Sequence, residues 1–223
     1  MLADPRVSHG FDRLSSVYDA CVKLVFGNSI SDFTKTSLLL LNPAEHCLIV
    51  GGGSGQVLVD AFDRELANHY IYCELSPKMI EAAKKRISQD DETRVSFIQN
   101  VETELGNNSI DIVIFPFVLD CFHESSINQL FGNLNPHLTE NSQVLIIDFN
   151  REPIAGFAPS LFQKFFIAIL YFFFRLFTGI EAKELPHIFS IMQKRGWTLI
   201  RNNSIKNGWI QGSLWAQNQF GLK

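Results

Sequence analysis

Four glycines separate an apolar run from an amphipathic run in the segment "HCLIVGGGSGQVLVDAF", at positions 46–62: Gly51, Gly52, Gly53 and Gly55. Glycine has no Cβ and adopts positive φ without strain, so it lets a backbone approach a ligand closely. The Lys that a phosphate-binding P-loop requires is absent after Gly55, and Gln56 stands where a dinucleotide fingerprint needs its third glycine. The pattern that remains is G-x-G-x-G, which indicates a ligand that does not need phosphate contacts to bind.

Glu74 supplies the second part of this candidate site. It lies at the end of the next predicted strand, "YIYCEL". In a doubly wound sheet the ends of the first two strands lie side by side at the ligand crevice. A carboxylate at that point can accept hydrogen bonds from both hydroxyls of a ribose. The loop and Glu74 together therefore predict an adenosine-type ligand.

The elements that must position these residues follow from the hydrophobic pattern. Strand-like runs at residues 47–50, 70–75, 95–99, 110–119 and 143–149 alternate with helical patterns, and runs at 197–205 and 209–217 predict a hairpin around Asn207 and Gly208. Ser76 and Pro77 predict a helix start, and another helical face is expected from Ile127 to Leu138. The predicted fold class is α/β, a Rossmann-like, doubly wound, seven-stranded sheet, mostly parallel with a C-terminal antiparallel strand.

Length and composition limit the function classes. The 223 residues predict a single domain, 1–223, with a helical cap (1–42), a ligand-binding core (43–150) and a last part (151–223) made of a Phe-rich helix, a second helix and the hairpin. A net charge of −4 argues against nucleic-acid binding. The four cysteines show no metal-binding spacing, so no metal is expected, and Cys47 and Cys73 are expected as buried thiols. The N-terminus lacks signal-peptide features, so a cytoplasmic location is expected.

Several segments resemble, in order, the motifs of class I S-adenosylmethionine-dependent methyltransferases. They are "LIVGGGSGQ", "IYCELSPKMIEAAKKRI", "VSFIQNVETEL" and "DIVIFPFVLDCF". The layout is most similar to the ubiquinone/menaquinone-biosynthesis C-methyltransferase-like group, because "FDRLSSVYD" and "LPHIFSIMQKRGW" resemble its N-terminal and C-terminal patterns. The resemblance implies S-adenosyl-L-methionine as cofactor and methyl transfer to a small-molecule acceptor.

The resemblance also implies a role for each matched residue. The glycines at 51, 52, 53 and 55 would run against the methionine part of the cofactor, Glu74 would hold the ribose, and Leu75 would pack on the adenine. Asn100 would reach the adenine amine and Val101 would offer its backbone N–H.

Three further residues complete the implied cofactor site. Phe115 and Pro116 would lie near the sulfonium, and Tyr18 would close over the cofactor. Two departures from the family pattern stand out. Ile49 replaces the usual acidic residue two positions before the first glycine, and an ungapped match puts the Asp position of the third-strand motif on Val101.

Methyl transfer from a sulfonium needs alignment and exclusion of water, and it needs a base when the acceptor is a hydroxyl or a carbon acid. Candidates for that base are Asp120 and His123, which follow the fourth predicted strand, and Asp148, which ends the fifth. Other roles stay open: a helix-start carboxylate for Asp120, a solvated loop residue for His123, and a backbone N–H acceptor for Asp148.

The Phe-rich segment at 161–177 is too short to cross a bilayer, which takes about 20 apolar residues. A helix that is apolar on nearly every side must be covered. It is expected to cap the active site or form a homodimer contact, with a peripheral membrane helix as the alternative. Each of these roles suits a hydrophobic or aromatic acceptor.

Two other functions stay open from the sequence. Polyamine aminopropyltransferases have a similar loop, but they carry an acidic residue at the position of Ser54 and paired Asp residues after the fourth strand, where this chain has only Asp120. A catalytically degenerate relative that binds cofactor or lipid and serves as an interaction module is the other alternative, suggested by Ile49.

Overall fold

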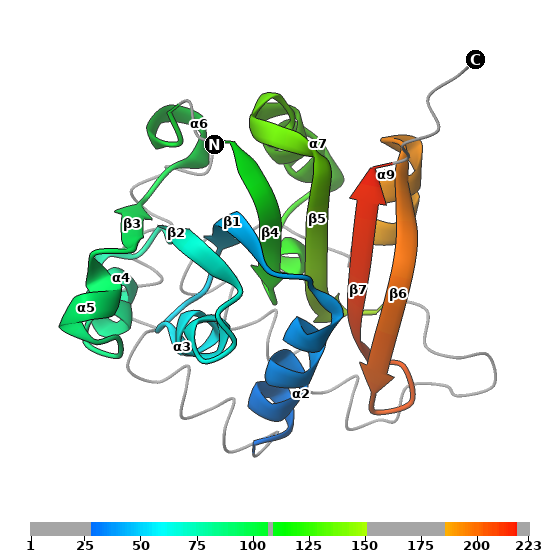
Figure 1. Cartoon of the computed structure of the whole chain (residues 1–223). Helices are drawn as coiled ribbons and strands as arrows, with labels where there is room; N and C mark the ends of the chain where they lie inside the picture. Colours follow the sequence, from blue (N-terminus) through cyan, green and yellow to red (C-terminus); the bar gives the residue numbers. More distant parts are fainter. Residues whose placement is uncertain (1–27, 107–108, 151–185, 218–223) are drawn as a thin grey trace.

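A seven-stranded sheet forms the centre of the computed structural model, which describes residues 28–106, 109–150 and 186–217 (Figure 1). The strands are β1 (Ala44–Val50), β2 (Ala67–Cys73), β3 (Val95–Ile98), β4 (Ile110–Pro116), β5 (Leu138–Phe149), β6 (Trp197–Ile205) and β7 (Ile210–Gln217). Their order is β3-β2-β1-β4-β5-β7-β6, and β7 alone runs antiparallel to its neighbours. The predicted fold class is confirmed.

Helices cover both faces of this sheet. One face packs against α2 (Ser29–Ser37), the short helix η1 (Leu38–Leu40), α3 (Gln56–Phe62) and α4 (Pro77–Lys84). The other packs against α6 (Val101–Glu104), α7 (Glu124–Leu134) and α9 (Ile188–Lys194). The remaining short helices are α5 (Gln89–Glu92), η2 (Leu119–Cys121) and η3 (Asn135–His137). The strand order reverses between β1 and β4, and such a switch point is where open α/β sheets bind ligands.

Local sequence signals explain several boundaries. Ser76 caps α4 by accepting a hydrogen bond from the Met79 N–H at 3.3 Å, and Pro77 is the first helical residue, as predicted. The expected helix that ends at Leu138 is too long, because Pro136 lies in η3 and Leu138 already begins β5. Proline disfavours continued α-helix on its N-terminal side, which explains the early end of α7.

The predicted hairpin between β6 and β7 is present. Lys206, Asn207 and Gly208 have φ values of 53°, 58° and 81°, and Ile205 pairs with Ile210 across the turn. The fourth strand is shorter than predicted. It ends at Pro116, because the next residue, Phe117, has a φ of 54° and leaves the extended conformation. The backbone N–H of Phe117 donates to the Ile147 carbonyl at 2.7 Å.

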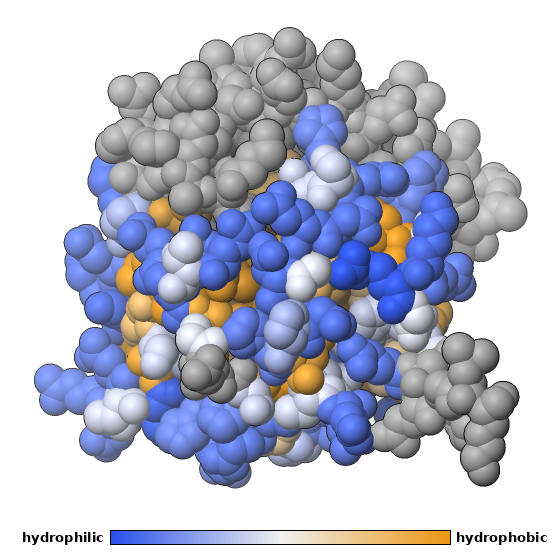
Figure 2. All heavy atoms as spheres, turned by 90° about the horizontal axis from the view of Figure 1, so that it is seen from above, coloured by the Kyte–Doolittle hydropathy of each residue, from blue (hydrophilic) through white to orange (hydrophobic). Residues whose placement is uncertain are grey.

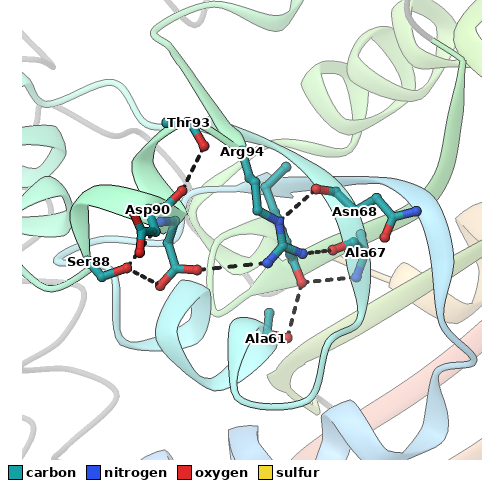
Figure 3. A network of polar contacts seen from close by, with 9 residues as sticks. Ala61, Ala67, Asn68, Ser88, Asp90, Thr93 and Arg94 are labelled. Atoms are coloured by element: carbon teal, nitrogen blue, oxygen red, sulfur yellow. Dashed lines mark hydrogen bonds and ion pairs between the residues drawn. The ribbon is translucent and has the colours of Figure 1, made fainter.

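The amino end of β2 carries a network of polar contacts (Figure 3). Arg94 donates to the carbonyl oxygens of Asn68 at 3.0 Å and Ala67 at 2.6 Å. The buried Tyr70 hydroxyl donates to the Ala61 carbonyl at 3.1 Å and accepts from the Ala67 N–H at 3.0 Å. These bonds tie β2 to α3 and to the segment before β3, far from the carboxyl ends of the strands.

The surface seen from above in Figure 2 is the side on which α6 and α7 lie at the top of Figure 1. Hydrophilic residues dominate its described part, and apolar atoms show in separate gaps between them.

None of the helices within 28–106, 109–150 and 186–217 has the length and apolar character that a membrane crossing requires. Tyr18, most of the predicted cap and the Phe-rich segment at 161–177 lie outside the described residues.

Candidate functional site

The glycine loop after β1 adopts a conformation that only glycine takes readily. Gly51, Gly53 and Gly55 have φ values of 72°, 61° and 96°. A Cβ on Gly51 would collide with Val118 in the turn after β4, one on Gly52 would lie 2.5 Å from the Tyr72 ring, and one on Gly55 would lie 2.6 Å from Ala83 Cα.

Gly53 differs from its neighbours, because a Cβ there would meet no atom of the described residues within 4 Å. Packing within the described protein therefore explains the lack of a side chain at positions 51, 52 and 55 but not at 53. Open space beside the Cα of Gly53 is what a bound ligand needs if it is to lie against this loop.

Glu74 lies directly beside this loop, where the sequence predicts it. The Gly51 N–H donates to the Cys73 carbonyl at 2.8 Å, which joins the ends of β1 and β2. Glu74 Oε2 accepts from the Gly53 N–H at 3.0 Å, and Oε1 accepts from the Ser76 N–H at 3.1 Å. Burial raises the pKa of Glu74, while these backbone hydrogen bonds oppose the rise. The ribose role remains a prediction, compatible with the two lone pairs on each carboxylate oxygen.

Asn100 and Val101 lie just after the end of β3, the edge strand that neighbours β2. Asn100 caps α6, since its side-chain oxygen accepts from the Glu102 N–H at 2.8 Å and its own N–H donates to Glu104 at 2.9 Å. The Val101 side chain is buried. Gln99 reaches back to the half-buried Leu75, donating to its carbonyl at 3.3 Å. The ends of β2 and β3 are thus brought together, and the adenine contacts remain predictions.

Phe115 and Pro116, predicted near the sulfonium, point to opposite faces of β4. Phe115 is fully buried, and its ring lies 5.5 Å from that of Phe131 in α7. Pro116 is half-buried at the end of the strand. The structure therefore gives the Phe115 ring a packing role beneath α7.

Asp120 and Asp148, two of the three predicted bases, lie together. Both are buried, and Asp148 Oδ2 accepts from the Asp120 N–H at 3.0 Å while Oδ1 accepts from the Phe149 N–H at 2.8 Å. Burial raises the pKa of Asp120 to about 6. The pKa of Asp148 is raised well above its usual value by burial and then by the charge of Asp120. A half-buried thiol, Cys121, donates to Asp120 Oδ1 at 3.3 Å.

His123, the third predicted base, does not join this pair. It is exposed at the N-cap position of α7, where its side chain makes no capping hydrogen bond.

Within the described ranges no three His, Cys, Asp or Glu side chains could hold a metal ion. Cys47 and Cys73 are buried free thiols, as predicted.

Aromatic residues near the ends of β4, β5 and β7 were not singled out from the sequence. The ring centres of Phe117 and Phe149 are 5.5 Å apart, and those of Phe149 and Trp209 are 5.1 Å apart. Tyr72 was also missed, although its hydroxyl donates to the Gly53 carbonyl at 2.9 Å. The signal for Tyr72 was its spacing, because it lies two positions before Glu74 and so shares one face of β2.

Comparison with known proteins gives one family-model match and a shared fold. A family model described as a methyltransferase domain matches residues 48–144. No curated protein sequence matches the chain. Among solved structures, an O-methyltransferase family protein from Burkholderia thailandensis aligns with 16% identity and a TM-score of 0.67, over 94% of this chain and 61% of that one.

Two other solved structures share the fold. Mitomycin 7-O-methyltransferase aligns with 16% identity and a TM-score of 0.64, over 93% of this chain and 60% of that one. A LepI variant in complex with SAH and a substrate analogue aligns with 13% identity and a TM-score of 0.59, over 79% of this chain and 43% of that one. The chain thus spans less than two thirds of each of these proteins, and at such identities the likeness is one of fold.

Proposed function

We propose that this chain is an S-adenosylmethionine-dependent methyltransferase that acts on a small hydrophobic or aromatic acceptor. The observation that carries the proposal is the pairing of the glycine loop with Glu74, in which Glu74 Oε2 lies 3.0 Å from the Gly53 nitrogen. The match of residues 48–144 to a methyltransferase domain supports it, as does the fold shared with a protein that binds SAH.

The residues present fit this cofactor. The open side of Gly53 admits the methionine part, and Glu74 stands where ribose hydroxyls can reach a buried carboxylate. When bound, S-adenosylmethionine supplies an activated methyl group on a good leaving group. The protein must then align the acceptor and keep water out, which requires little covalent chemistry from side chains.

We assign the proton-accepting role to Asp120. It is buried at the carboxyl end of β4, on the ligand side of the sheet. Burial raises the pKa of both carboxyl groups, and the charge of Asp120 adds to the rise at Asp148, so the pair resists double ionisation and favours taking up a proton. A base of this kind suits an acceptor that must lose a proton, such as a phenol or an acidic carbon.

The aromatic row of Phe117, Phe149 and Trp209 supports a flat, apolar acceptor. Phe117 and Phe149 are half-buried and follow the strands that carry the candidate bases. Aromatic rings favour offset or tilted contacts with other rings, so a planar acceptor could extend the row. The Phe-rich segment at 161–177 would add to this enclosure, with a homodimer or peripheral membrane contact as its other proposed roles.

A second candidate function is cofactor binding without catalysis. The observation that favours it is Ile49, an apolar and fully buried residue at the position where the resembled family carries an acidic residue. A protein of this kind would bind the cofactor and transfer nothing.

Calorimetry and a transfer assay separate these candidates. Isothermal titration with S-adenosylmethionine and S-adenosylhomocysteine should show binding of both ligands. Methyl-labelled S-adenosylmethionine, incubated with a panel of phenols, hydroxyquinones and aromatic amines, should then label at least one compound. Binding without labelling favours the second candidate, and the absence of binding contradicts both.

Asp120→Asn tests the assigned base. Loss of a general base typically lowers the rate by about 10²- to 10⁴-fold, while affinity for S-adenosylhomocysteine should stay unchanged. His123→Asn is the matched control, because this side chain is exposed and apart from the pair. A variant of Asp120 that is as fast as the wild type would contradict the assignment.

A further inference from the structure

The Gly53 residue is held at both of its polar groups by side chains of β2. The Tyr72 hydroxyl donates to the Gly53 carbonyl at 2.9 Å, and Glu74 Oε2 accepts from the Gly53 N–H at 3.0 Å. Tyr72 and Glu74 are two positions apart, so their side chains leave the strand on the same face. The two bonds fix the orientations of the peptide groups on both sides of the Gly53 Cα.

The strand that leads into the loop offers no polar side chain for this purpose. Ile49 and Val50, the last two residues of β1, are apolar and buried. Ile49 is the register partner of Tyr72 in the parallel pair of β1 and β2. Arg86 donates to the Ser54 hydroxyl of the loop at 3.1 Å, but the side-chain hydrogen bonds to Gly53 itself come from Tyr72 and Glu74, on the strand beside Ile49.

Packing holds the Tyr72 ring in place. The side chain is fully buried, and its ring meets that of Phe97 edge-on with centres 5.6 Å apart. A Cβ on Gly52 would lie 2.5 Å from this ring, so the loop rests directly on it. A ring confined in this way cannot take its hydroxyl away from the Gly53 carbonyl without disturbing the loop.

We propose that Tyr72 is a positioning residue for cofactor binding, which holds the Gly53 peptide in the orientation that keeps its open side toward the ligand. Glycine has the widest choice of backbone conformations and loses the most conformational entropy when it is fixed. The residue type at position 53 therefore does not by itself set the orientation of the peptide groups. Tyr72 and Glu74 fix that choice before the ligand arrives. This inference rests on the proposed function, because the ligand it concerns is S-adenosylmethionine or its product.

Tyr72→Phe tests the inference with S-adenosylhomocysteine as the probe. The variant keeps the ring and loses only the hydroxyl. A neutral hydrogen bond of this kind corresponds to about a three- to tenfold rise in Kd when it is lost. Isothermal titration measures the Kd, and the backbone amide resonance of Gly53 should shift in the ligand-free variant.

Tyr70→Phe is the matched control. Tyr70 lies on the same strand and face and is equally buried, and its hydroxyl makes two hydrogen bonds at the other end of β2. Its loss should lower the melting temperature while leaving the Kd and the Gly53 resonance unchanged. Equal Kd values for Tyr72→Phe and the wild type would overturn the inference, and so would an equal rise in both variants.

The outcomes for the inference and for the proposed function are distinct. A wild-type protein without affinity for S-adenosylhomocysteine contradicts the proposed function. A wild-type protein that binds, beside a Tyr72→Phe variant that binds equally well, contradicts the role of Tyr72 alone. If Tyr72→Phe does not fold, the ligand-free wild type decides: the buried Tyr72 hydroxyl proton should exchange slowly enough to be observed by NMR, and exchange at the rate of a solvated phenol would overturn the inference.

Discussion

Two turns at the carboxyl edge of the sheet are held by the same kind of hydrogen bond, but they are built from different residue types. Glu74, at the end of β2, accepts the Gly53 N–H in the turn after β1. Asp148, at the end of β5, accepts the Asp120 N–H in the turn after β4. Each turn is thus tied by a buried carboxylate from a neighbouring strand.

The difference lies in the backbone that the carboxylates hold. The turn after β1 reaches positive φ with glycines, while the turn after β4 does so with Phe117, at a φ of 54°. A bulky residue in that conformation costs free energy that glycine does not. The Phe117 ring gains contact with Phe149. In the proposed function the first turn leaves its backbone accessible to the cofactor, whereas the second carries the side chains proposed to contact the acceptor and take its proton.

Gly53→Val should break the first turn with the largest effect. A Cβ at Gly53 meets no atom within 4 Å among residues 28–106, 109–150 and 186–217, so a side chain there would occupy the space assigned to the ligand. We expect no measurable binding of S-adenosylhomocysteine by calorimetry. The residue would also carry a backbone strain of about 1–2 kcal/mol at a φ of 61°.

Gly196→Val separates that strain from the loss of ligand space. Gly196 has a φ of 81°, and a Cβ there also meets nothing within 4 Å, but it lies between α9 and β6, before the amino end of β6. The control should be destabilised and bind normally. Normal binding by Gly53→Val would show that the loop does not face the ligand.

Glu74→Gln should weaken the same turn by a smaller amount. Hydrogen bonds to a charged group are each worth about 1.5–3 kcal/mol, so loss of the charge predicts binding of S-adenosylhomocysteine that is weaker by about 10- to 100-fold. The amide oxygen can still accept from the Gly53 N–H, which preserves part of the loop geometry. Calorimetry measures the Kd, and unchanged affinity would remove Glu74 from ribose binding.

The sequence predicted the first turn better than the second for a physical reason. Glycine spacing and a carboxylate at a strand end are local signals, because each follows directly from residue type and alternation along one strand. The strand–helix alternation that predicted a doubly wound sheet, and the hairpin around Asn207 and Gly208, are set by similarly local patterns. These features could therefore be predicted from the sequence.

The turn after β4 depends on contacts that no local pattern encodes. The strand was predicted to run to residue 119, but Phe117 turns away because its ring packs on Phe149 and its N–H meets the Ile147 carbonyl. The pairing of Asp120 with Asp148 joins two strands 28 residues apart in sequence. For Tyr72 the spacing from Glu74 indicates the shared face of β2, but it does not indicate that the hydroxyl meets the Gly53 carbonyl of the neighbouring loop.

The last and smallest expected effect is a change in the pH dependence of stability, and it tests the carboxylate pair of the second turn. Burial raises the pKa of Asp120 to about 6 and that of Asp148 well above its usual value. Between an ordinary Asp pKa of about 4 and these raised values, the folded protein binds more protons than the unfolded chain, so the free energy of unfolding falls as pH rises, by up to about 1.4 kcal/mol per pH unit for each extra proton. Asp148→Asn removes one such group and keeps an oxygen for the Asp120 N–H, so urea unfolding from about pH 4 to 6 should show a shallower fall in the variant. Glu74 contributes with the same sign in both proteins and cancels in the comparison. Equal slopes would mean that folding does not raise the pKa of Asp148 in this range, which would contradict a carboxylate pair that resists double ionisation.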